Sequence, residues 1–147
     1  FWSYAGIAAG SDGSLYVTNE ASGIGTNDSI FTVNPTNGER EQFASGLISP
    51  EGIGFSANGE FPLYVVEEHA GADGGRLSRI EADGSHTPLC AGFQDIEDVA
   101  IDQAGRLYIS EDGSGSIIQV QAAALTPVYL PTLLRHSIVL GPARYRR

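Results

Sequence analysis

The chain has 147 residues, of which 41% are hydrophobic and 18% are charged, and its formal net charge at pH 7 is −10. That length fits one domain that buries a core, and the apolar fraction argues against a disordered chain. No stretch approaches the roughly 20 consecutive apolar residues of a transmembrane helix, so we expect no membrane span.

The charge is unevenly distributed along the chain. All 18 acidic residues and four of the eight arginines lie in residues 1–134, which leaves −14 there and +4 in residues 135–147. An acidic body repels phosphate backbones, so we expect no nucleic-acid partner. The chain begins at Phe1 rather than Met and has one cysteine, Cys90, so no internal disulfide is available. We expect an extracellular or periplasmic protein, either matured or a fragment.

The main feature is an internal repeat of 46 residues, the interval that separates Gly13, Gly59 and Gly105. In each unit a short apolar run meets a two-residue turn signal, and a run rich in β-branched and aromatic residues follows, which is typical of a hairpin. A third strand is predicted next, and a fourth precedes Gly46 and Gly92. The predicted strands are 6–9, 15–20 and 30–33 in unit one, 52–55, 63–68 and 77–80 in unit two, and 98–101, 107–112 and 117–120 in unit three.

Four antiparallel strands in about 46 residues match the size of a β-propeller blade, so we predict an all-β fold of three such blades. Their expected bounds are 5–47, 48–93 and 94–121. Residues 122–147 are expected to form an extended segment, interrupted by Pro127 and Pro131, and a basic arm.

The repeats resemble those of six-bladed propellers of the NHL and senescence-marker-protein/gluconolactonase type. The resemblance rests on Pro50-Glu51-Gly52-Ile53, Asn58-Gly59 and Leu63-Tyr64-Val65, which residues 107–112 repeat in part. Three blades do not close a ring, since propellers have about four to eight. Three explanations remain open: the chain is part of a longer one, two copies complete six blades, or the end segments cap the array.

Acidic residues recur at equivalent positions of the repeat. Glu20, Glu68 and Asp112 follow the second strands, and Glu51 and Glu97 precede the first strands by one residue. Because the symmetry of a propeller brings equivalent positions to one mouth, we expect these five side chains to converge and to hold a divalent cation, calcium or similar. The resemblance implies the same: in gluconolactonase-like propellers a metal at the central mouth polarises a lactone carbonyl.

Candidate catalytic residues are Glu51, Glu68 and His69, which lies in a glycine-rich loop beside Glu67-Glu68. The alternative for the carboxylates is that they cap strand ends and keep the protein soluble. For His69 the alternative is a solvated loop residue. The recurring residues Tyr16, Tyr64 and Tyr108 are expected to pack in the core rather than to bind a sugar.

Two functions remain open. The first is a binding or assembly module without catalysis of its own, which self-associates through blade edges or through the 122–147 arm. The second is a metal-dependent sugar-lactone or ester hydrolase of gluconolactonase type, complete only as a dimer or in a longer chain and acting on a small sugar-like ligand. A fragment of a quinone-dependent sugar dehydrogenase is a weaker third, because cationic residues that would hold the cofactor are scarce in the blades.

Overall fold

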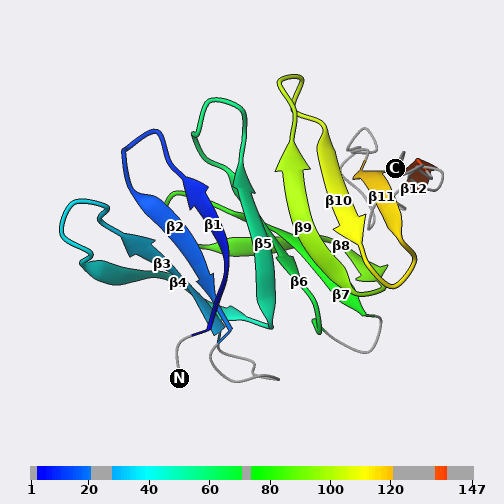
Figure 1. Cartoon of the computed structure of the whole chain (residues 1–147), viewed down its shortest axis with the longest axis horizontal. Helices are drawn as coiled ribbons and strands as arrows, with labels where there is room; N and C mark the ends of the chain where they lie inside the picture. Colours follow the sequence, from blue (N-terminus) through cyan, green and yellow to red (C-terminus); the bar gives the residue numbers. More distant parts are fainter. Residues whose placement is uncertain (1–2, 21–27, 71–73, 121–134, 139–147) are drawn as a thin grey trace, which may run out of the picture.

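The computed structural model describes residues 3–20, 28–70, 74–120 and 135–138, and these form strands joined by turns and loops, with no helix among them. They build three four-stranded antiparallel sheets, which we call blades 1, 2 and 3 (Figure 1). Blade 1 contains β1 (Tyr4–Ala9), β2 (Leu15–Asn19), β3 (Asp28–Val33) and β4 (Arg40–Leu47). Blade 2 contains β5 (Pro50–Phe55), β6 (Leu63–Glu67), β7 (Gly75–Ile80) and β8 (His86–Phe93). Blade 3 contains β9 (Ile96–Ile101), β10 (Leu107–Glu111), β11 (Ser116–Val120) and β12 (Arg135–Ile138).

The predicted all-β class with propeller-type blades is confirmed. In each blade the strands pair in chain order, from the first to the fourth. The fourth strand of blade 3 comes from Arg135–Ile138, which pairs with β11 and which the sequence analysis assigned to the C-terminal arm. The extended segment predicted around Pro127 and Pro131 lies outside the described residues.

The hairpin between the first and second strands is formed by the same turn in all three blades. Gly13, Gly59 and Gly105 donate their N–H to the carbonyl oxygen three residues earlier, at 3.1, 2.8 and 2.9 Å. Their φ angles of 83°, 72° and 76° lie in the left-handed region. Only glycine adopts this conformation without strain, which is the physical reason for the spacing of these glycines in the sequence.

The hydrophobic core lies between neighbouring blades. One cluster, including Tyr16, Ile53 and Val65, joins blades 1 and 2, and a second, including Val66, Val99 and Ile109, joins blades 2 and 3. The predicted core position of Tyr16 is confirmed: its ring is buried and contacts Phe43, Phe55 and Phe61 edge to face. Each blade is therefore stabilised by the next one, because a single sheet leaves one face uncovered.

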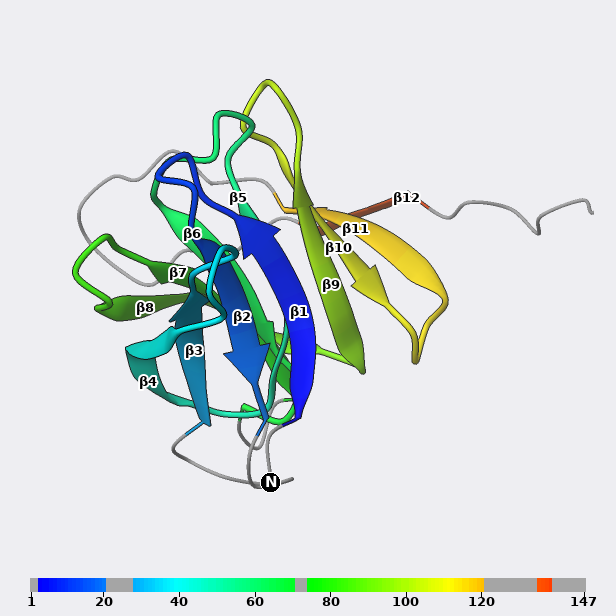
Figure 2. The ribbon, with the colours of Figure 1, turned by 60° about the vertical axis from the view of Figure 1, so that its left-hand side comes forward.

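The first strands lie side by side: β1 packs against β5, and β5 packs against β9. From them the sheets extend outward, blade 1 in the order β1 to β4 and blade 3 in the order β9 to β12 (Figure 2). All three first strands run in one direction, and each second strand is antiparallel to the first strand of its blade. The beginnings of the first strands and the ends of the second strands therefore lie at the same end of the array (Figure 1). The described part of the chain has no helix long and apolar enough to cross a membrane.

Candidate functional site

The three blades place the residue after each second strand in the same way. The backbone N–H of Glu20 donates to the carbonyl oxygen of Ser3 at 2.9 Å, and that of Glu68 donates to Ser49 at 2.9 Å. In blade 3, Asp112 donates to Asp95 at 2.8 Å. These bonds tie the end of each second strand to the residues that enter the first strand, so the three acids occupy equivalent positions in the fold.

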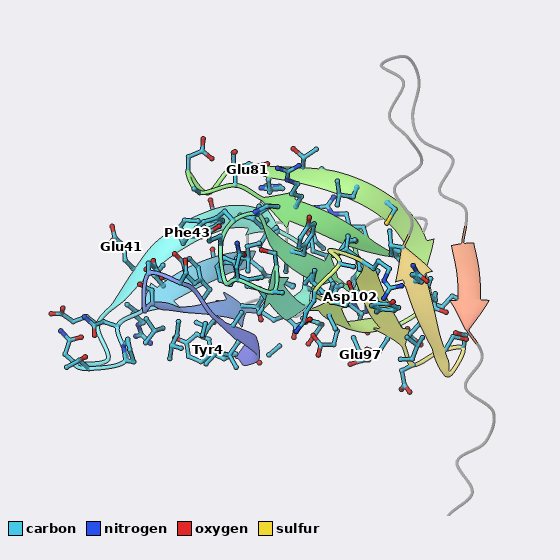
Figure 3. The ribbon with its side chains drawn as sticks, turned by 90° about the horizontal axis from the view of Figure 1, so that it is seen from above. Tyr4, Glu41, Phe43, Glu81, Glu97 and Asp102 are labelled. Atoms are coloured by element: carbon cyan, nitrogen blue, oxygen red, sulfur yellow. The ribbon has the colours of Figure 1, made fainter. Side chains whose placement is uncertain are left out.

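Glu51 and Glu97 lie at the starts of β5 and β9 and line a shared cavity. The cavity has a volume of about 420 Å³ and is bounded by the first strands of all three blades, with Ala5, Gly6 and Ile7 on the blade 1 side. Figure 3 shows Glu97 and Tyr4, of the first strands β9 and β1, along one margin of the molecule, with Glu81 along the opposite one. The cavity is thus formed by the innermost strands, at the end where the carboxylates recur.

Among the carboxylates at this end of the array, the structure gives Glu51 a strongly raised pKa. Burial of the side chain, followed by repulsion from Glu20, Glu68 and Glu97, raises the pKa of the Glu51 carboxyl to about 7, while His69 acts in the opposite direction. The Glu51 carboxyl therefore titrates near neutral pH rather than in the usual range of a glutamate. Glu20, Glu68 and Glu97 are thus close enough to Glu51 to act on its charge, and so is His69. Four of the five acids singled out in the sequence therefore lie near one another. Asp112 of blade 3 is not among the groups that act on Glu51.

His69 lies beside Glu68, with its Nδ1 3.1 Å from a carboxylate oxygen of Glu68. The imidazole is 49% exposed and the Glu68 side chain 25% exposed, so water reaches both groups. The exposure of the imidazole fits the solvated loop histidine expected as the alternative.

A second row of polar groups, one residue earlier in each second strand, has a structural role. Asn19, Glu67 and Glu111 are buried, and each accepts a backbone N–H from the segment that enters the first strand of its own blade. Glu67 also accepts two bonds from Arg76, at 2.8 and 2.7 Å, and one from Ser78 at 2.6 Å. Alternation along β6 places Glu67 on the same face as the buried residues Leu63 and Val65, and this period of two in the sequence is a signal for its burial.

The described residues contain no group of three or more His, Cys, Asp or Glu side chains close enough together to hold a metal ion. The candidate set Glu20, Glu51, Glu68, Glu97 and Asp112 shares one end of the array without forming a ready coordination shell. The divalent cation stays a prediction. The chemistry that the geometry itself supports is binding of a polar or cationic group and proton exchange at Glu51.

Comparisons with known proteins support the fold. Neither the models of known protein families nor the curated proteins include a match to this chain. Among solved structures, the chain is similar to virginiamycin B lyase from Staphylococcus aureus, with a TM-score of 0.60 and 18% sequence identity. The match covers 93% of this chain and 42% of the lyase chain, so the protein spans less than half of that structure. The fold defines a class, β-propeller blades, and the comparison at this identity shows the fold alone.

Proposed function

We propose that this chain is a β-propeller binding and assembly module, in which the end faces of the three-blade array bind further blades. The observation that carries the proposal is the exposure of Ile7. Ile53 and Val99 occupy the same position in blades 2 and 3 and are each only 5% exposed, whereas Ile7 is 63% exposed. In blades 2 and 3 the preceding blade covers this position of the repeat. No blade precedes blade 1 within the described residues, so Ile7 stays exposed.

The opposite end of the array has a corresponding face, which no further blade covers among the described residues. In blade 1, Tyr16 and Thr18 are buried under blade 2, and the Thr18 hydroxyl donates to the carbonyl oxygen of Glu51 across the blade boundary at 2.8 Å. Their counterparts Tyr108 and Ser110 are half-buried and line a cavity of about 200 Å³ in blade 3. Both ends thus present surfaces that the internal blade boundaries cover.

The test is native mass spectrometry of the wild-type chain and the Ile7→Asp variant over a range of concentrations. We expect the wild type to show a concentration-dependent species of twice 15.5 kDa, because the apolar face of blade 1 gains cover on association. Ile7→Asp places a charge on that face and should reduce this species strongly, while a matched charge on the exposed outer strand, Gln42→Asp, should leave it unchanged. Equal association of wild type and Ile7→Asp would contradict the proposal.

A second candidate function is metal-dependent sugar-lactone or ester hydrolysis of the gluconolactonase type, in an extracellular or periplasmic setting. It is favoured by the Glu51 carboxyl, which has a pKa of about 7 and lines the inner cavity, since a group of that pKa exchanges protons efficiently at neutral pH. Lactone hydrolysis that is abolished by chelator and by Glu51→Gln, but not by Glu41→Gln, would support it. Activity that survives both treatments would count against it.

A further inference from the structure

The blade boundaries inside the chain depend on a glycine in the first strand. A Cβ atom on Gly6 would lie 2.5 Å from the carbonyl oxygen of Glu51, and one on Gly52 would overlap the Oδ1 and Cα atoms of Asp98. These positions are far inside van der Waals contact, so the following blade rests directly on these glycines. Any side chain at either position would push the two blades apart.

The side chain that lies over Gly6 is Ile53 of blade 2, and its equivalent in blade 1 is the exposed Ile7. The Cγ2 atom of Ile53 lies 3.0 Å from the position of a Cβ on Gly6. Ile53 is therefore buried over the glycine of the preceding blade, and Ile7 is the residue at the same position of blade 1. A further blade that covers Ile7 in the same way would need a glycine at the position of Gly6, opposite the Ile7 side chain.

Blade 3 does not offer that surface. At the position of Gly6 and Gly52 it carries Asp98, which is exposed and whose carboxylate accepts the backbone N–H of Val99 at 2.8 Å. If a second copy packed its blade 1 on this face with the internal geometry, the Cβ atom of Asp98 would overlap the backbone around Gly6, just as a Cβ on Gly6 would overlap the backbone of blade 2.

We infer that the exposed face of blade 1 is an interface for a propeller blade that carries glycine at the position of Gly6 and Gly52, and that Asp98 makes blade 3 of a second copy a poor substitute. The inference rests on the proposed function and specifies the partner: a four-stranded blade outside the described residues of this chain. Self-association of the wild type is accordingly weak, and the direction in which the array extends is set by residue 98.

The test compares association constants, measured by sedimentation equilibrium, for the wild type and for Asp98→Gly, Asp98→Asn and the double variant Ile7→Asp/Asp98→Gly. We expect Asp98→Gly to associate about tenfold or more tightly than the wild type, since it removes the overlap of one Cβ with packed backbone. Asp98→Asn removes the charge but keeps the Cβ, so it should remain close to the wild type. The double variant should lose the gain.

The outcomes separate the two proposals. If Ile7→Asp has no effect in any background, the blade 1 face is not an interface and the proposed function fails. If Ile7→Asp weakens association but Asp98→Gly and Asp98→Asn behave alike, the face is correct and the glycine requirement is overturned. Tight Ile7-dependent association of the wild type, with a dissociation constant below about 1 μM, would overturn the glycine inference without any residue 98 variant.

Discussion

Glu51 shows how the fold turns an ordinary carboxyl into a group that titrates at neutral pH. Its pKa of about 7 arises first from burial in the inner cavity and then from repulsion by Glu20, Glu68 and Glu97. The other repeated acids follow a different logic. Glu67 is fully buried, yet it is ion-paired with Arg76 and hydrogen-bonded to Ser78, so its charge is compensated. The carboxylate whose charge is not compensated by an ion pair in this way is therefore the one that lines the cavity.

The raised pKa of Glu51 predicts a specific dependence of stability on pH. The folded state holds the Glu51 proton up to about pH 7, whereas the unfolded chain releases it near pH 4.5, so the stability contribution of this group falls as pH rises between these values. At pH 8 we expect Glu51→Gln to be more stable than the wild type by about 1 kcal/mol, a figure reduced for the solvent access of the side chain.

The measurement is denaturant unfolding of both proteins at pH 5 and pH 8. The difference between them should be small at pH 5 and appear at pH 8, whereas Glu41→Gln, on an exposed outer strand, should follow the wild type at both values. A constant difference across the range would show that Glu51 has an ordinary pKa.

At the scale of the elements, the first strands carry the blade contacts. The sequence predicts where these strands end, because Gly13, Gly59 and Gly105 mark the hairpin turns that follow them. It does not reveal that Gly6 and Gly52 are contact points, since a glycine without a positive φ has no local signature. That role is visible only in the three-dimensional structure, where atoms of the next blade occupy the space that a Cβ on either glycine would need.

We predict that Gly52→Ala destabilises the protein by about 2–3 kcal/mol, because its Cβ would overlap the backbone at Asp98 and Glu97. The matched control is Gly105→Ala, where φ is 76° and no atom lies within 4 Å of the added Cβ, so only backbone strain of about 1 kcal/mol is expected. Thermal and denaturant unfolding of both variants provide the comparison. A Gly52→Ala cost no larger than that of Gly105→Ala would show that the blades can separate freely.

At the scale of the whole molecule, the repeat predicts three blades and the end of the array at which the acids gather. Glu20, Glu51, Glu68 and Glu97 could be grouped from spacing alone, because equivalent positions of a propeller share one end. Spacing does not tell how far Asp112 lies from the others. It also misses the fourth strand of blade 3, because Arg135–Ile138 is separated from β11 by 14 residues of chain and its pairing is a long-range contact.

The central claim is that the end faces of the array are blade interfaces with the geometry seen inside the chain. Disulfide trapping tests it most directly. A Cβ on Gly54 would lie 2.9 Å from the side chain of Ile101, and the corresponding pair between two copies is Ala100 of one and Ala9 of the other. The trap uses the Asp98→Gly background, in which the overlap at residue 98 is removed. Cys90→Ser/Asp98→Gly chains carrying either Ala9→Cys or Ala100→Cys would be mixed under mild oxidation.

We predict a disulfide-linked heterodimer that forms faster than either homodimer and that is suppressed when Ile7→Asp is added to the Ala9→Cys chain. The suppression is expected because Ile7 lies within the contact that brings the two cysteines together. Heterodimer formation no faster than random pairing of exposed thiols, or unaffected by Ile7→Asp, would contradict the account.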